Sequence, residues 1–137
     1  MVTSIILTNS IFNTLKDISD RAYPYEACAF LVGKINGDTV IARYADEVKN
    51  LDRSSVSFSV SSEDLLKVYE NASSMNLDIV GIFHSHPYSK AYPSSKDLKY
   101  MSINQVPWVI LSMLDYELRA FVCDEICLKE LKVVIVD

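Results

Sequence analysis

The chain of 137 residues lacks the features that would place it outside the ordinary globular proteins. Its first apolar run, Ile5-Ile6-Leu7, is far too short for the core of a signal peptide or for a membrane span. The formal net charge is −5, and the sequence has no cluster of Lys and Arg. A nucleic-acid-binding role therefore has no electrostatic basis. Internal repeats and low-complexity segments are also absent. We therefore expect one domain over residues 1–137, cytoplasmic, with neither nucleic acid nor membrane as a partner.

Cysteine is scarce and unpaired in pattern. Cys28, Cys123 and Cys127 are odd in number and form no CxxC spacing. Such a set argues against a disulfide scaffold and fits a reducing cytosol. Cys123 and Cys127 could bind a metal together with a histidine, but buried thiols in strands are the more common use of such residues. We adopt the buried-thiol interpretation.

The apolar pattern predicts an α/β or α+β domain. Hydrophobic residues make up 50% of the chain and charged residues 23%, as in ordinary globular proteins. Asn36-Gly37 is a hairpin signal between two strands, and residues 46–55 are polar enough for a surface loop. Helices interspersed with strands and hairpins favour a mixed β-sheet flanked by about three helices. The expected strands cover residues 2–7, 26–35, 39–44, 56–60, 79–83, 106–114, 117–123 and 126–136. The first expected helix starts at a cap within residues 8–10 and ends at Tyr23-Pro24, and the other two cover 61–76 and 94–103.

Histidine is rare, and its placement is informative. The chain has only two, His84 and His86, separated by one residue. An apolar run over residues 79–83 leads directly into them and predicts a buried strand. Residues two apart on a strand point to the same side, so both imidazoles can converge on one small object. Pro87 then ends the strand pairing, because proline has no N–H to donate. A histidine pair alone stays only suggestive, since it also suits pH sensing or simple hydrogen bonding.

A carboxylate follows the histidines at a helix start. Ser94-Ser95-Lys96-Asp97 precedes a short apolar pattern and matches a capping box, in which the serine and the acid satisfy each other's backbone N–H groups. On this interpretation Asp97 either caps the helix or binds a metal, whereas Ser94 can cap and still present its hydroxyl. Two imidazoles and one carboxylate form a zinc-type ligand set that leaves a fourth position for water.

Hydrolysis at such a site needs a base and a donor for the developing oxyanion. The chain has no HExxH motif to supply the base. Glu26, at the start of an apolar strand, is the outstanding candidate. An exposed glutamate at a strand end is a common alternative, and composition alone does not decide between the two.

Together these motifs resemble a known family. His84-Ser85-His86-Pro87, six further residues and then Ser94-Ser95-Lys96-Asp97 resemble the HxHPx(6)SxxD signature of the JAMM (MPN+) metalloproteases. The upstream segment over residues 24–28 resembles the one that carries the family's catalytic glutamate, although Ala29 stands where members often have glycine. The order of strands and helices also agrees with the MPN fold over nearly the whole chain.

The resemblance implies a role for each of five residues. His84, His86 and Asp97 correspond to the ligands of one Zn²⁺ per chain. Glu26 corresponds to the general base and acid that carries the proton to the leaving amine. Ser94 corresponds to the hydroxyl that helps to stabilise the oxyanion. Because all five are intact, the resemblance implies an active enzyme.

The resemblance also implies a class of substrate, the C-terminal tail of a ubiquitin-like protein. With only the short loop over residues 46–55 where other members carry insertions, the chain looks like the compact archaeal and bacterial members, so we expect a desampylase- or deubiquitinase-like zinc isopeptidase. The tail is expected to add as a strand near residues 49–60. Two alternatives stay open: a peptidase that processes a sulfur-carrier protein in cofactor or amino-acid biosynthesis, and a non-enzymatic interaction domain with a structural metal. The sequence indicates no oligomeric state.

Overall fold

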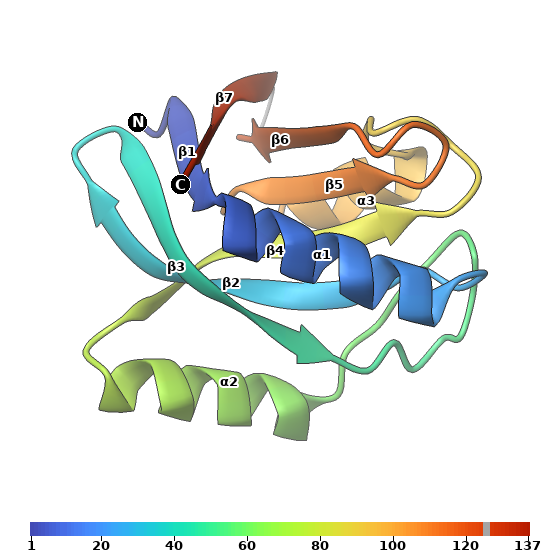
Figure 1. Ribbon diagram of the computed structural model, residues 1–137, viewed down its shortest axis with the longest axis horizontal. Coiled ribbons are helices and arrows are strands. Elements are labelled where there is room, and N and C mark those ends of the chain that lie inside the picture. Colours follow the sequence, from blue (N-terminus) through green and yellow to red (C-terminus); the bar gives the residue numbers. More distant parts are fainter. Residues whose placement is uncertain (125–126) are drawn as a thin grey trace.

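A computed structural model describes residues 1–124 and 127–137. Within these residues the strands form a mixed sheet that closes into a barrel, in the order β1-β3-β2-β4-β5-β6-β7 (Figure 1). Strand β1 closes the barrel by pairing in parallel with both β3 and β7. The predicted mixed sheet with three helices is confirmed. The elements are β1 (Ser4–Thr8), α1 (Asn9–Ala22), β2 (Cys28–Asn36), β3 (Thr39–Val48), α2 (Ser62–Ser74), β4 (Asp78–His86), α3 (Ser95–Met101), β5 (Trp108–Ser112), β6 (Leu118–Cys123) and β7 (Leu128–Val136).

Each helix packs on its own hydrophobic cluster. Helix α1 contributes Ile11, Leu15 and Ile18 to the main core, which all the strands share. Helix α2 lies against the outer face of β2 and β4, and α3 against β5 and β6 (Figure 1). Strand β5 therefore buries side chains on both faces, with Leu111 in the main core and Ile110 under α3. This two-sided burial explains why the sequence of β5 is almost continuously apolar.

The helix starts agree with the predicted caps, but one predicted helix face is only partly buried. Thr8 accepts a hydrogen bond from the N–H of Ile11 at the start of α1, and Ser61 accepts one from Asp64 at the start of α2. Val68 and Ala72 of α2 are buried as expected. Leu65 and Tyr69, predicted on the same face, are 44% and 60% exposed. Helix α2 thus contacts the sheet along a narrower stripe than its sequence suggests.

Three predicted features are corrected. Residues 56–60 form no strand, because polar side chains take up the backbone groups of this loop: Asn50 donates to the carbonyl of Ser57 and accepts from the N–H of Ser59, at 3.1 and 3.3 Å. The predicted loop over residues 46–55 starts later, since β3 continues to Val48. The hairpin turn falls one residue later than predicted, with Gly37 at φ +64° in its first central position.

The C-terminal strand is present as predicted, whereas the cysteines differ in part from the prediction. The predicted strand over residues 126–136 is present as β7, which starts at Leu128. Residue 126, the first of the predicted strand, lies outside the described part of the chain. All three cysteines are free; Cys28 is buried, Cys123 is half-buried and Cys127 is exposed. The buried-thiol interpretation, which concerned Cys123 and Cys127, is therefore only partly right for Cys123, at the end of β6, and wrong for Cys127. None of the helices in the described ranges is both long enough and apolar enough to span a membrane.

Candidate metal centre

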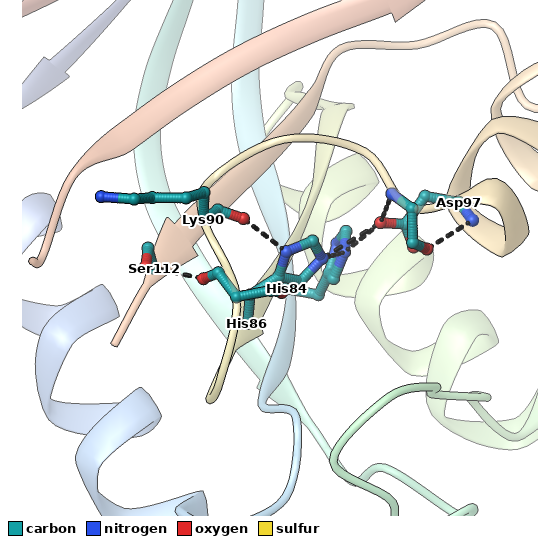
Figure 2. Close-up of polar contacts among 7 residues, drawn as sticks. His84, His86, Lys90, Asp97 and Ser112 are labelled. Carbon is teal, nitrogen blue, oxygen red and sulfur yellow. Dashed lines mark hydrogen bonds and ion pairs between the residues drawn. The ribbon is translucent and has the colours of Figure 1, made fainter. Parts of the chain in front are cut away.

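Both histidines lie at the end of a central strand. Strand β4 pairs antiparallel with β2 and parallel with β5, and His84 lies opposite Cys28 on one side and Ile110 on the other. The backbone around the two imidazoles is therefore held from both sides. Asp97 reaches the same place from the first turn of α3, which follows the loop after β4 (Figure 2). The sequence prediction that these three side chains converge agrees with this arrangement.

The three side chains meet through single atoms. The Nε2 atoms of His84 and His86 are 3.0 Å apart, and each is 3.1 Å from Oδ2 of Asp97. His84 is 0%, His86 3% and Asp97 6% exposed. Figure 2 shows both rings directed at the Asp97 carboxylate. This is a compact, buried set of two nitrogens and one oxygen.

Asp97 caps its helix with the same oxygen that faces the histidines. Oδ2 accepts a hydrogen bond from the N–H of Ser94 at 2.9 Å, and Oγ of Ser94 accepts one from the N–H of Asp97 at 3.0 Å. Capping therefore does not turn Asp97 away from the histidines, because one carboxylate oxygen has lone pairs for both contacts, and whether Asp97 also binds a metal stays a prediction. The capping box itself fixes the carboxylate in place. Ser94 accepts with its oxygen and keeps its hydroxyl proton free to donate.

A backbone contact sets the tautomer of His86. Its Nδ1 lies 2.8 Å from the main-chain carbonyl of Lys90 (Figure 2). Because a carbonyl only accepts hydrogen bonds, we assign the ring proton to Nδ1, which leaves the lone pair of Nε2 directed at the site. The loop that presents Lys90 is held in turn by the hydroxyl of Ser112, which donates to the carbonyl of Ser89 at 2.7 Å. Such outer contacts orient histidines that bind metal ions.

The donor atoms fit a zinc ion. A neutral His86 nitrogen and an ionised carboxylate oxygen both present lone pairs at 3.1 Å, so only a proton or a cation between them relieves their repulsion. Zinc bonds of about 2.0–2.2 Å in tetrahedral geometry separate neighbouring ligand atoms by roughly 3.3 Å. The observed separations of 3.0–3.1 Å are close to that value. Two imidazoles and a carboxylate are donor types that zinc accepts in proteins.

Glu26 lies beside this set, just before β2. It is 4% exposed, and its Oε1 has no hydrogen-bond partner among the described residues. A carboxylate oxygen of Glu26 and the ring nitrogens of His84 and His86 lie within 4.8 Å of one another. Burial raises the pKa of Glu26 to about 8, Asp97 adds to the rise, and His86 opposes it. A buried acid without a partner is the arrangement expected of a group that exchanges protons.

Two different sets of three side chains could therefore hold a metal ion. Glu26 with the two histidines forms one potential set, and Asp97 with the same histidines forms the other. We favour Asp97 as the third donor because its oxygen is already 3.1 Å from both nitrogens and is held by the helix cap. Glu26 then belongs to the layer around the metal set.

The pKa values of the three donors follow from burial and their mutual contacts. Burial lowers the pKa of His84 and outweighs its hydrogen bond with Asp97. Burial also opposes charge on His86, but its hydrogen bonds with Asp97 and the Lys90 carbonyl raise its pKa above the ordinary value. Burial alone would raise the pKa of Asp97, yet the two histidines hold it well below its ordinary value, because in the metal-free chain a proton on Nε2 of either ring forms a hydrogen bond to Oδ2. Asp97 is thus an anion at neutral pH.

Ser85 links the strand of Glu26 to the strand of the histidines. Its hydroxyl accepts a hydrogen bond from the N–H of Ala27 at 2.8 Å, and its own N–H donates to the carbonyl of Ala27 at 3.1 Å. Sequence reasoning missed this contact, although alternation along β4 places residue 85 on the opposite face from the histidines. The link fixes Glu26 relative to the ligand set across two strands.

Other supporting groups carried no signal in the sequence. Phe58 stacks on His84 with ring centroids 4.9 Å apart, and Trp108 meets the same ring edge-on at 5.9 Å. Asn50 donates to the carbonyl of Glu26 at 3.0 Å. Their proximity depends on strand order and on the path of a loop, which local sequence patterns do not specify.

Two cavities border the site. One of 350 Å³ touches Asp97 and has an apolar wall that includes Phe30, Phe58, Ile82 and Trp108. The other, of 460 Å³, touches Glu26 and lies between the end of α1, the start of β2 and the loop after β3. One cavity therefore touches the ligand set at Asp97, and the other touches only the neighbouring Glu26.

Comparison with known proteins now decides the family. A family model described as prokaryotic homologs of the JAB domain matches residues 8–124, which include all five predicted site residues. The chain belongs to the prokaryotic JAB-domain family. This membership confirms the resemblance seen in the sequence.

Relatives agree over most of the chain. It is 37% identical over 110 residues to a desampylase of Pyrococcus furiosus, covering 80% of this chain and 74% of the relative. It is 28% identical over 120 residues to a CysO-cysteine peptidase of Mycobacterium tuberculosis, covering 85% of this chain and 81% of the relative. Among solved structures, a protein from Desulfitobacterium hafniense matches with a TM-score of 0.89 at 25% identity and covers 96% of this chain and 92% of the other.

Proposed function

We propose that this chain is a zinc-dependent peptidase that hydrolyses the bond after the C-terminal tail of a ubiquitin-like protein. The observation that carries the proposal is the convergence of His84, His86 and Asp97, at 3.0–3.1 Å, beside the buried and unpartnered Glu26. Membership in the JAB-domain family and 37% identity to a desampylase support the reaction class and the kind of substrate. We further propose that residues 1–137 act as one domain and work in the cytoplasm.

In this proposal His84, His86 and Asp97 hold one zinc ion. A bound zinc ion supplies Lewis acidity, which lowers the pKa of water and polarises a carbonyl. The Lys90 carbonyl keeps the His86 lone pair on the metal side, and the capping box keeps Oδ2 of Asp97 there. With three protein donors the set leaves room for substrate or water, whereas structural zinc sites are usually closed by four. The open set argues for an enzyme over a structural-metal interaction domain.

Glu26 and Ser94 carry out the remaining tasks. Glu26 accepts the proton of the attacking water and then delivers it to the nitrogen of the leaving amine. Its burial and its pKa of about 8 suit a group that must both accept and release a proton near neutral pH. Ser94 donates its free hydroxyl proton towards the oxyanion while its oxygen still caps α3. A cap and an oxyanion donor are compatible roles because they use opposite ends of the same hydroxyl.

We place the tail of the substrate in the cavity that touches Asp97. The cavity is bordered by residues 57–60 on one side and by the start of α3 on the other, and its apolar wall suits an extended chain. Residues 56–60 are not part of the sheet, so the tail would pair with a loop and not with a preformed strand. Pairing along backbone groups of this kind is a common way to bind a peptide.

A second candidate is the processing of a sulfur-carrier protein. The observation that favours it is the 28% identity to a CysO-cysteine peptidase over 85% of the chain. The chemistry at the ligand set is the same for both candidate functions. Only a comparison of the substrates that the chain cleaves can therefore distinguish them.

The test uses a panel of ubiquitin-like and sulfur-carrier proteins that end in Gly-Gly. Each is offered as a lysine conjugate and as a linear extension to the full chain loaded with zinc, and cleavage is followed by mass spectrometry. We expect cleavage after Gly-Gly that chelator abolishes and zinc restores. A zinc-loaded chain that cleaves no member of the panel would favour the interaction-domain alternative.

A further inference from the structure

The cavity beside Glu26 carries charge that the proposed reaction does not use. It is the larger of the two cavities at the site, at 460 Å³. Its walls combine the last turn of α1, the residues that lead into β2, the end of β3 and the loop that follows. The charged residues of its lining are Arg21, Glu26, Glu47, Lys49 and Arg53.

Two of the three cations in this lining have no ion-pair partner among the described residues, although the Arg53 guanidinium lies over the ring of Tyr25, 5.8 Å from its centroid. Arg21 forms a two-pronged ion pair with Glu47, at 3.0 and 3.3 Å. Lys49 and Arg53 form no ion pair with any residue in the described ranges. Arg53 also has a backbone φ of +47°, a conformation uncommon for a residue with a side chain. In a chain with a net charge of −5, this cavity is a local concentration of positive charge.

Its position identifies the part of the substrate that would enter it. The group that protonates a leaving nitrogen must lie within hydrogen-bond reach of that nitrogen. If Glu26 has this role, the leaving amine departs on the Glu26 side of the ligand set. The acyl tail then occupies the apolar cavity at Asp97, and the residue that carries the amine occupies the cationic cavity.

We propose that the cavity lined by Lys49 and Arg53 binds a free carboxylate on the leaving group, and that the chain therefore prefers linear substrates. In such a substrate an α-amino acid is attached directly to the tail, so its carboxylate lies only two carbon atoms from the scissile nitrogen. A lysine conjugate presents an aliphatic chain at the same place and gains nothing from the two cations. This inference rests on the proposed function and names the chemical class of its leaving group.

The test compares leaving groups on one acyl protein, the panel member that the zinc-loaded chain cleaves best. Its Gly-Gly tail carries alanine with a free carboxylate, alanine as the carboxamide, or the ε-amine of Nα-acetyl-lysine amide. We expect kcat/KM for the carboxylate to exceed that for the carboxamide roughly tenfold, mostly through KM, as for a partly exposed charge-assisted contact. The lysine conjugate is expected to be cleaved no better than the carboxamide.

Variants then assign the preference to the cavity. In the double variant Lys49→Gln with Arg53→Gln, the ratio of carboxylate to carboxamide should fall to within about twofold of unity. The matched control, Arg43→Gln with Lys132→Gln, removes the same charges from exposed sites on β3 and β7 outside the cavity and should keep the ratio. Single variants serve if the double variant does not fold, and the wild-type comparison needs no variant.

The outcomes separate this inference from the proposed function. Equal kcat/KM for carboxylate and carboxamide in the wild-type chain overturns the inference, as does a preference for the lysine conjugate or an unchanged ratio in the double variant. In each of these cases cleavage itself still supports the proposed function. Failure to cleave any panel member overturns the proposed function, and the inference with it.

Discussion

At the scale of single residues, Glu26 separates catalysis from metal binding. We predict that Glu26→Gln lowers kcat by roughly 10²–10⁴-fold, the usual contribution of a positioned general base. Zinc content and fold should stay unchanged, because the proposed zinc donors are atoms of His84, His86 and Asp97. Glu70→Gln, at an exposed glutamate on α2 away from both cavities, is the matched control. Steady-state kinetics and metal analysis make the measurement, and normal turnover in the Glu26→Gln variant would show that the base is another group.

Glu26 also predicts a pH dependence of stability in the metal-free chain. Its pKa is about 8 when folded against an ordinary value of 4.5, so between these pH values the unfolded chain releases a proton that the folded chain keeps. The contribution of Glu26 to stability is therefore complete below pH 4.5 and is lost as the pH rises to about 8.

The measurement is urea unfolding of chelated wild type and chelated Glu26→Gln across this range. The free energy of unfolding of the wild type, relative to the variant, should fall by up to about 1.4 kcal/mol per pH unit between the two pKa values. A difference that stays constant with pH would mean that Glu26 is already ionised in the folded, metal-free chain.

Asp97 can be tested in a way that spares its helix cap. In Asp97→Asn the amide oxygen can still accept the N–H of Ser94, so α3 should keep its start. The variant loses the anionic charge that faces the two histidines, and we predict at least a roughly tenfold weaker affinity for zinc. Zinc titration can be followed by the fluorescence of Trp108, whose ring is 5.9 Å from that of His84. Unchanged affinity, with helix content preserved, would assign Asp97 to the cap alone.

At the scale of elements, the segments that carry the site were predictable and the segments that surround it were not. The ends of α1, the buried β4 and the start of α3 follow from local patterns: caps, apolar runs and a proline. Residues 56–60 alternate like a strand, yet Asn50 and Asp52 hold them as a loop; Asp52 alone accepts from the hydroxyls of Ser57 and Ser59. Side-chain contacts of this kind override an alternating pattern, and no local rule reveals them.

This loop changes how strand addition should be tested. The N–H of Ser59 donates to Asn50, so Ser59→Pro would disturb the loop itself. The N–H of Ser57 has no hydrogen-bond partner among the described residues, which makes Ser57→Pro the cleaner variant. If the tail pairs with this loop, Ser57→Pro should raise KM for tail-extended substrates several-fold and leave zinc content unchanged. Ser57→Ala is the control for the lost hydroxyl, and an unaltered KM in Ser57→Pro would move the tail elsewhere.

At the scale of the whole molecule, sequence reasoning gave the fold class but not the closure of the sheet. The closure depends on β1 pairing in parallel with both β3 and β7, contacts between segments more than thirty residues apart. The same long-range order places Trp108 against His84 and Cys28 opposite His84, and it creates both cavities. The candidate site residues could be named from motif spacing and from the family resemblance, whereas the cavity walls and supporting contacts could not, because these depend on strand order.

The closed barrel also predicts what metal removal does to the molecule. Three hydrophobic clusters extend through the chain without any contribution from the ligand set, so we expect the chelated protein to stay folded. If zinc binds only the folded arrangement of β4 and α3, as proposed, a concentration 100 times the Kd should stabilise it by about 2.7 kcal/mol, or roughly 10 °C in Tm. Calorimetry with and without chelator measures the shift, and Asp97→Asn, which lacks the third donor, should show a smaller one. A chelated chain without helical or sheet circular dichroism would instead mark the ion as a structural element, since small domains that depend on structural zinc unfold without it.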